Sequence, residues 1–380
     1  MDVDILQDAC TLPPLANDWH DLLARTAGRT LYLTPEWLTT WWNHFGQNNQ
    51  LRIVSVRDAG RLVGLAPLMI SRWEGFRHLG MIGTGLADYE DLIVADDAER
   101  ASVISAILDA LDADPSWDFL QMNRFRDDSL NLPLLRSLMF KRGGFRCINA
   151  PFSVAPYIPI VQSWSEYWKS LSSSLRRGTE RRRRRLQEEF QSIQYGAPVS
   201  LEEVDHYTNT LIHLNVTRHR DVRGFWSVVE EEPHAAFHRD LARSLFQTGQ
   251  LDFPSIVVDG TIAALQLNAR YNGVYYGILP AFDDRFARFS VGRLLQLQVI
   301  KRSFEEGFSE FTMLEGDEAY KFELTGHVRK LLSFSAFRYE VRGALAHLWF
   351  SGIRERFRRS DRARRLIPWL RRHGLLEHMS

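Results

Sequence analysis

The sequence has few of the residues on which small secreted domains and zinc proteins depend. Only two cysteines occur among its 380 residues, Cys10 and Cys147. They are too few for a disulfide framework and lack the spacing of a zinc cluster, so we expect a reducing compartment. No stretch approaches 18 uninterrupted apolar residues, and the sequence therefore predicts no membrane-spanning helix.

Several well-defined functional motifs are also missing. The chain contains neither a P-loop nor a GxSxG elbow, and its histidines form no HExxH pattern. We therefore expect no metal cofactor. The first residues, Met1 to Asp4, are acidic where a secretory signal is basic, which favours a cytoplasmic location.

The composition is that of a globular protein, with 45% hydrophobic and 25% charged residues and a formal net charge of zero. A chain of this length is expected to form about two domains. The zero net charge conceals two basic segments. Residues 176–185 contain seven Arg and one Glu, and residues 341–380 contain ten Arg but only three acidic residues.

Apolar periodicity and turn residues predict an α/β (α+β) fold with two similar halves. In the first half, helices are expected near 31–46, 99–112 and 131–141, with a hairpin whose turn lies at residues 58–61. In the second half, helices are expected at about 163–192, 201–217 and 233–247. The Asp259-Gly260 and Asn272-Gly273 turns then predict three antiparallel strands, followed by a helix over 293–306 and the strand EFTML. We interpret this repeated order as an internal duplication.

A polar, glycine-containing turn precedes the helix expected at 293–306. The first N–H groups of a helix lack intrahelical acceptors, and together with the helix dipole they can bind an anion. Gly292 lets a ligand oxygen approach, and Arg293 adds a positive charge. The alternative is that Ser290 simply caps the helix.

Seven blocks of sequence, taken in order, resemble the GNAT acyltransferase superfamily, and within it the CelD-like proteins, associated with cellulose biosynthesis and related to the FemAB aminoacyltransferases. The resemblance covers about residues 30–330 and does not clearly include the tail. The blocks are PEWLTTWW (35–42), GRLVGLAPL (60–68), GLADYEDLIV (85–94), the Arg-rich segment after Leu171, VVDGTIAALQL (257–267), AFDDRFARFSVGRLL (281–295) and LEGDEAYKFELTG (314–326).

The resemblance implies two tandem GNAT-like domains, each a mixed, mostly antiparallel sheet flanked by helices. We predict boundaries at 1–155 for a degenerate first copy, 156–340 for the copy that binds acyl-CoA, and 341–380 for a basic tail. In the second copy, the pyrophosphate of acyl-CoA is expected at Ser290, Val291, Gly292 and Arg293. The segment 95–99 at the corresponding place in the first copy contains three acidic residues, which would repel phosphate.

The segment 314–321 carries the candidate catalytic residues. Acyl transfer from a thioester to an amine needs a base, an acid for the leaving thiolate and donors for the oxyanion. Glu315 or Asp317 is the candidate base, Tyr320 the acid, and Lys321 the residue that stabilises the oxyanion or holds an anionic acceptor. The alternative is a surface turn with a loose Lys–carboxylate pair.

Two further groups are predicted to bind substrate. Asp88, Tyr89 and Asp91 follow a Gly-Thr-Gly turn and are candidates for the acceptor site, although a solvated turn would have the same composition. Arg177 and Arg181 lie four residues apart on the expected Arg-rich helix, where like charges repel. This indicates an anionic partner. The candidates are RNA or DNA, anionic lipid, the coenzyme A 3′-phosphate and acidic residues of the protein itself. The alternative is a solvated face that nearby glutamates screen. No aromatic residues interleave with these arginines, which argues against stacking on single strands.

The tail mixes arginines with Trp, Phe, Ile and Leu, a pattern typical of helices that lie on an anionic membrane surface, and equally of terminal helices that pack on their own domain. The sequence therefore predicts an acyltransferase that uses acyl-CoA and acts on an amine or hydroxyl of a cell-envelope polysaccharide or related precursor, with peripheral inner-membrane association as a hypothesis. Two alternatives are a FemAB-like transferase that uses aminoacyl-tRNA and a non-catalytic scaffold of a polysaccharide-synthesis system.

Overall fold

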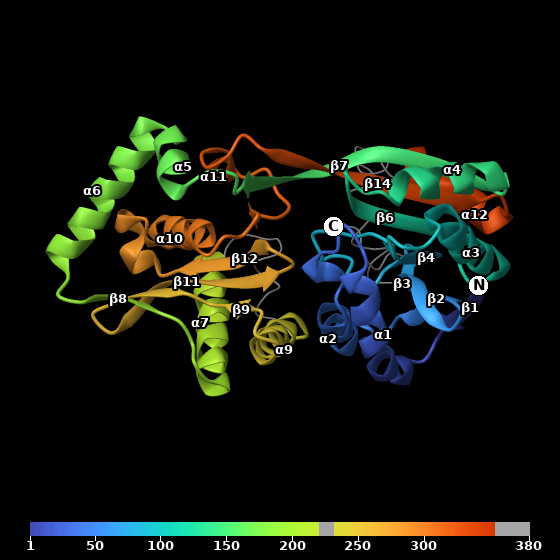
Figure 1. Ribbon diagram of the computed structural model, residues 1–380, viewed down its shortest axis with the longest axis horizontal. Helices are drawn as coiled ribbons and strands as arrows, with labels where there is room; N and C mark the ends of the chain where they lie inside the picture. Colours follow the sequence, from blue (N-terminus) through green and yellow to red (C-terminus); the bar gives the residue numbers. More distant parts are fainter. Residues whose placement is uncertain (220–231, 354–380) are drawn as a thin grey trace. The chain divides into compact units, whose positions relative to one another are not determined.

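The computed structural model describes residues 1–219 and 232–353, which form two compact units (Figure 1). Of the described residues, the first unit contains 1–152 together with 330–353, and the second lies within Ser153–Arg329. Both mix helices with a mostly antiparallel sheet, so the predicted fold class is confirmed.

The sheet of the first unit has the strand order β1-β2-β3-β4-β6-β14, with β7 beside β14 and the short β5 paired with β3. All of these pairs that have a described register are antiparallel except β4 with β6. Its strands are β1 (Asp2–Leu6), β2 (Gln50–Asp58), β3 (Arg61–Trp73), β4 (Phe76–Met81), β5 (Ile93–Val94), β6 (Phe119–Arg126), β7 (Phe145–Pro159) and β14 (Val328–Arg338). Its helices are η1 (Ala9–Thr11), α1 (Leu12–Ala24), η2 (Leu31–Leu33), α2 (Pro35–Phe45), α3 (Arg100–Ala113), α4 (Leu132–Arg142), α12 (Val341–Leu348) and the π-helical turn η4 (Trp349–Ile353).

The sheet of the second unit has the order β13-β12-β11-β10-β8, with β9 paired with β11 and the end of β7 beside β13. Its strands are β8 (Ile193–Gly196), β9 (Leu251–Asp252), β10 (Ser255–Val258), β11 (Thr261–Tyr271), β12 (Val274–Phe282) and β13 (Glu310–Thr312). Its helices are α5 (Trp164–Ser170), α6 (Ser173–Glu189), α7 (Leu201–His219), α9 (His234–Gln247), η3 (Asp284–Phe289), α10 (Val291–Glu305) and α11 (Ala319–Phe322). Figure 1 shows α10 on one face of this sheet and α7 with α9 on the other.

The two units repeat one order of elements. In each, three antiparallel strands lead to a helix, and the helix returns the chain to a strand parallel to the third. The series is β2-β3-β4, α3 and β6 in the first unit, and β10-β11-β12, α10 and β13 in the second. This is the duplication that the repeated turn and helix signals predicted.

The structure differs from the sequence prediction in two places that matter for the site. The helix expected over 163–192 is two helices, because Ser163 caps α5 through Glu166 N and Ser172 caps α6 through Leu175 N. The strand 328–338, which the predicted boundary at residue 340 places in the second domain, pairs with β6 of the first unit. The predicted boundaries at 155 and 340 remain a prediction.

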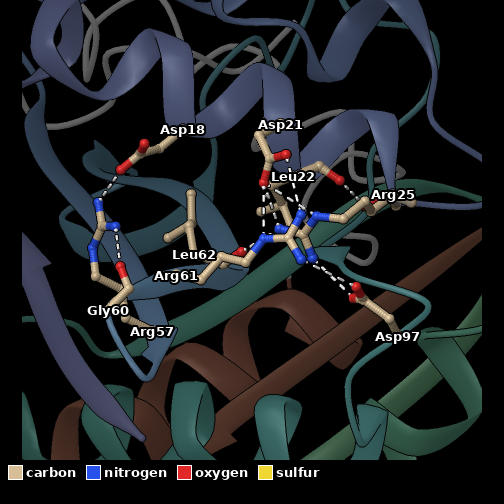
Figure 2. Close-up of polar contacts among 10 residues, drawn as sticks. Asp18, Asp21, Leu22, Arg25, Arg57, Gly60, Arg61, Leu62 and Asp97 are labelled. Atoms are coloured by element: carbon tan, nitrogen blue, oxygen red, sulfur yellow. Dashed lines mark hydrogen bonds and ion pairs between the residues drawn. The ribbon is translucent and has the colours of Figure 1, made fainter.

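An exposed ion-pair network fixes the β2–β3 hairpin and the loop before α3 to helix α1 (Figure 2). Arg25 bonds Asp21 at 2.9 Å, Asp97 at 2.8 Å and the Leu62 carbonyl at 2.7 Å. Arg61 also contacts both carboxylates. The hydrogen bonds from Arg61 and Arg25 lower the pKa of Asp21. The acidic loop 95–99 is thus occupied by contacts within its own unit.

Candidate active site

A cavity of about 310 Å³ lies in the second unit, where β12 ends and α10 begins. Three segments come together at it, namely helix α7, the junction of β12 with α10, and the turn that leads into α11. The lining residues are Asn215, Arg218, Pro280, Phe282, Gly292, Arg293, Gln296, Glu318 and Tyr320. The cavity therefore unites three residues that the sequence singled out, Gly292, Arg293 and Tyr320.

Helix α10 begins without a side-chain cap. Ser290 adopts a left-handed backbone with φ 51°, and its carbonyl accepts from Leu294 N at 3.1 Å, but its hydroxyl makes no capping bond. The alternative reading of Ser290 as a simple capping side chain is therefore wrong. The first N–H groups of α10, at residues 291–293, are left for a ligand.

The equivalent helix of the first unit is capped by its own acid. Glu99 accepts from Ser102 N at 2.5 Å and from Ala101 N at 3.3 Å, and the bond from Ser102 lowers the pKa of Glu99. The carboxylate thus occupies the amides of the first turn of α3. The two units share an order of elements and differ at this helix start.

The lack of a side chain at Gly292 has a packing reason. A Cβ at this position would lie 2.9 Å from Cδ1 of Phe282, so the phenyl ring fills the space that glycine leaves. The guanidinium of Arg218 lies 3.7 Å from the centroid of the same ring. Phe282 is therefore held between α10 and α7, and it fixes these two helices at the cavity. The Val291 side chain is fully buried in the core, so only its backbone is available.

Arg293 supplies positive charge within the cavity. Its Nη2 bonds Glu323 at 2.8 Å, and its guanidinium lies 5.8 Å from the Tyr320 ring. Burial, reinforced by the charge of Glu318, raises the pKa of Tyr320 to about 12, and Arg293 opposes this shift. With or without this shift, Tyr320 is protonated at neutral pH, so its phenol is available as a proton donor.

The carboxylate that lines the cavity is Glu318, which the sequence analysis did not select. Glu315 is half-buried and Asp317 is exposed, and neither is among the residues that line the cavity. Glu318 is held by Lys321, whose Nζ lies 2.9 Å from its Oε2. Geometry thus favours Glu318 over both predicted bases.

Lys321 acts as a clamp for the turn. Its side chain is buried, and its ammonium donates to the Glu315 carbonyl at 2.7 Å, to Glu318, and more weakly to the Leu314 carbonyl at 3.4 Å. A Cβ on Gly316 would lie 2.8 Å from this nitrogen, so glycine is needed there. An ammonium has three donors, and all three are occupied. The contacts therefore disagree with the predicted oxyanion role of Lys321 and indicate a structural one.

The predicted acceptor residues lie in the first unit and have partners there. Asp88 accepts from the Tyr32 hydroxyl at 2.6 Å, and Tyr89 is buried. Asp91 accepts from Ser129 and Asn131, and burial raises its pKa to about 6. These contacts give the segment a structural role, and acceptor binding by it stays a prediction.

Arg177 and Arg181 are exposed on α6, which they share with Arg184 and Arg185. Within the described parts of the chain, none of these four has an ion-pair partner. The glutamates expected to screen them are only partly available, because Glu189 pairs with Arg288 of η3. Trp164 and Trp168 of α5 and Tyr195 of β8 line a cavity with Arg183, so aromatic rings that the sequence separates from the arginines lie beside α6.

The described start of the tail packs on the first unit. The Phe350 ring lies 4.9 Å from that of Trp73 and 5.0 Å from that of Phe119, and Trp349 Nε1 bonds Glu74 at 2.5 Å. The rest of the predicted amphipathic tail, 354–380, lies outside the described residues.

Within residues 1–219 and 232–353, no helix is both long and apolar enough to cross a bilayer. In the same part of the chain, no group of three or more His, Cys, Asp or Glu is placed to hold a metal ion.

Residues 173–322 match the family profile described as an acetyltransferase (GNAT) domain. No curated protein matches the chain in sequence. Among solved structures, FemX has a TM-score of 0.62 at 12% identity, with 92% of this chain and 99% of that chain covered.

Two further solved structures share the fold. The C-terminal domain of a putative lysylphosphatidylglycerol synthetase from Agrobacterium fabrum has a TM-score of 0.53 at 10% identity, with 89% and 95% covered. L-PGS from Bacillus licheniformis has a TM-score of 0.52 at 11% identity, with 90% and 96% covered. At these identities the likeness concerns the fold alone. The segment 173–322, which matches the GNAT acetyltransferase profile, contains α10, its uncapped start and Tyr320.

Proposed function

We propose that the second unit transfers an acyl group from acyl-CoA to an amine or hydroxyl acceptor. The observation that carries this proposal is the cavity itself, which joins the uncapped start of α10 to Tyr320 and Glu318. One end offers free backbone N–H groups and Arg293 for the pyrophosphate, and the other offers an acid and a base. This connected cavity also counts against the non-catalytic scaffold.

The reaction follows from these groups as a direct attack within a ternary complex. Glu318 takes a proton from the acceptor, whose freed lone pair attacks the thioester carbon. The C–S bond then breaks, and the departing thiolate takes the phenolic proton of Tyr320. Glu318 then releases its proton to solvent, and the Tyr320 phenolate takes a proton up from solvent. The acyl group ends on the acceptor as an amide or ester, and free coenzyme A leaves.

The acceptor in this proposal is a cell-envelope polysaccharide or related precursor. The resemblance to CelD-like proteins supports this class of acceptor. The first unit would not bind the donor, because Glu99 already occupies the start of α3. Release of free thiol from acetyl-CoA, measured with amino sugars and sugar nucleotides as acceptors, tests this part directly.

Calorimetric titration with acetyl-CoA and with longer acyl-CoA tests the donor. We expect wild-type protein to bind and Arg293→Gln to bind about tenfold more weakly or worse, because a hydrogen bond to a charged group is lost. Arg285→Gln is the matched control, since Arg285 is 71% exposed and pairs with Asp283 away from the cavity. Equal affinities for all three proteins would overturn the assignment of the donor to this cavity.

A second candidate is an aminoacyl-tRNA-dependent transferase, which the exposed arginines of α6 favour. FemX and the two lysylphosphatidylglycerol synthetase structures share the fold, and FemAB relatives use aminoacyl-tRNA as donor. In this alternative, Arg177 and Arg181 would contact phosphates of the RNA.

Salt dependence distinguishes the candidates. If tRNA binds along α6, its affinity falls steeply as salt rises, and Arg177→Gln with Arg181→Gln lowers the slope of log K against log salt by about 1 for each lost contact. The control is Arg239→Gln with Arg243→Gln on α9, where both arginines pair with acids of their own unit. A slope that neither double variant changes would remove α6 as a tRNA surface.

A further inference from the structure

Asn215 is a buried amide that the catalytic groups leave unused. It lies on α7, its side chain is only 3% exposed, and it lines the cavity beside Arg218 and Phe282. Its Nδ2 has no hydrogen-bond partner within residues 1–219 and 232–353. Buried amide donors are nearly always paired, because an unpaired one forfeits its hydrogen bonds to water. This unpaired donor therefore needs an explanation.

A second buried donor in the same cavity also lacks a hydrogen-bond partner in the described chain. Nη1 of Arg293 is buried and has no partner in the described chain, although Nη2 of the same residue bonds Glu323. The two donors come from different helices, α7 and α10, which meet around Phe282. A cavity with two unsatisfied donors is suited to a ligand that brings acceptor oxygens.

The two donors differ in the acceptor that suits them. Arg293 is cationic and lies in the first turn of α10, which is the place for a phosphate oxygen. Asn215 is neutral, and Pro280 and Phe282 present apolar surface in the same cavity. A neutral donor beside apolar groups suits an uncharged carbonyl, because the cation next to it on α7, Arg218, already lies 3.8 Å from the carboxylate of Asp284.

We propose that Nδ2 of Asn215 donates a hydrogen bond to a carbonyl oxygen of the acyl donor, either the thioester carbonyl or an amide carbonyl of the pantetheine arm. This inference rests on the proposed acyl-CoA function and adds a donor-recognition residue on α7. The protein keeps an unpaired amide in its free state, and the donor satisfies it on binding.

The test measures Tm and the affinity for acetyl-CoA in variants of Asn215. In Asn215→Leu, a side chain of similar shape removes the unpaired donor, so we expect an unchanged or higher Tm and about three- to tenfold weaker binding of acetyl-CoA. Asn215→Asp keeps the shape and replaces the donor with an anionic acceptor, so its affinity should fall further. Asn209→Leu, on the exposed face of the same helix, should bind acetyl-CoA as the wild type does.

Titration with free coenzyme A identifies the carbonyl. Equal losses for coenzyme A and acetyl-CoA in Asn215→Leu indicate a pantetheine amide, and a loss confined to acetyl-CoA indicates the thioester. Wild-type affinity in Asn215→Leu would overturn the inference while leaving the proposed function intact. A marked fall in Tm would also overturn it, because the amide would then be paired in the free protein. No binding of either probe to the folded wild type would overturn both proposals.

Discussion

Glu318 and Asp317 are adjacent carboxylates in different surroundings. Both side chains are exposed, but only Glu318 lines the cavity, where its carboxylate lies 2.9 Å from the Lys321 ammonium. If Glu318 is the base, Glu318→Gln should lower kcat about 10²- to 10⁴-fold with little change in acetyl-CoA affinity. Asp317→Asn should leave kcat within about twofold of wild type, since Asp317 does not line the cavity. Steady-state rates of thiol release measure both, and the reverse ranking would restore Asp317 as the base.

Tyr320 gives a prediction about pH. Because burial raises its pKa to about 12, the phenol stays protonated through neutral and moderately alkaline pH. We expect no alkaline limb from Tyr320 in the kcat profile below about pH 10, and about 10²-fold or greater loss of kcat in Tyr320→Phe. A limb near pH 8 that disappears in Tyr320→Phe would show that the phenol titrates much lower than its surroundings predict.

The sequence located part of this site and missed the rest for definable reasons. Gly292, Arg293 and Tyr320 belong to local motifs, so their neighbourhood could be predicted. Glu318 could not be ranked, because the choice among three nearby acids depends on the turn at Gly316 and on the direction of Lys321. Asn215 lies about 65 residues before the segment 281–295, on a helix whose sequence has no distinctive pattern. Only folding brings it to the cavity.

At the scale of elements, the starts of α3 and α10 differ in whether a side chain caps them, so we expect substitutions there to affect Tm differently. Glu99→Ala should lower Tm, because it removes the acceptor of two first-turn amides, while Ser290→Ala should change Tm less, since its hydroxyl makes no capping bond. The folded-state pKa of Glu99 lies below its ordinary value of 4.5, so its stabilisation is present above that value and is lost as pH falls through the lowered pKa. Thermal unfolding at neutral and acid pH checks this, and equal effects of the two substitutions at neutral pH would contradict the contrast.

Element types were easier to predict than their limits. The Asp-Gly and Asn-Gly turns predicted the meander, and the helical spacing of the apolar residues predicted the helix after it. The prediction of a single helix at 163–192 was wrong because Leu171 and Ser172 have extended backbones. Ser172 is the N-cap of a second helix, α6. The sequence does contain this N-cap serine, but the apolar residues keep helical spacing on both sides of it, which favoured a single helix.

At the scale of the molecule, β14 decides where the units divide. Phe334 is fully buried on β14 and Phe311 on β13, and β14 pairs with β6. Phe334→Ala should cost about 3–5 kcal/mol and speed amide exchange chiefly in β6, while Phe311→Ala should act chiefly on β12. Hydrogen exchange measured by mass spectrometry reports both. Faster exchange in β12 upon Phe334→Ala, with β6 unchanged, would assign β14 to the second unit. The sequence could not predict this pairing, because β6 and β14 are about 200 residues apart.

The measurement that tests the central claim most directly is amide hydrogen exchange with and without acetyl-CoA, compared at the starts of the two equivalent helices. The account predicts that acetyl-CoA slows exchange at 291–294, where α10 is uncapped, and leaves 100–103 unchanged, where Glu99 occupies the amides of α3. Protection at 100–103 without protection at 291–294 would place the donor in the first unit and contradict the account, as would binding that protects neither segment.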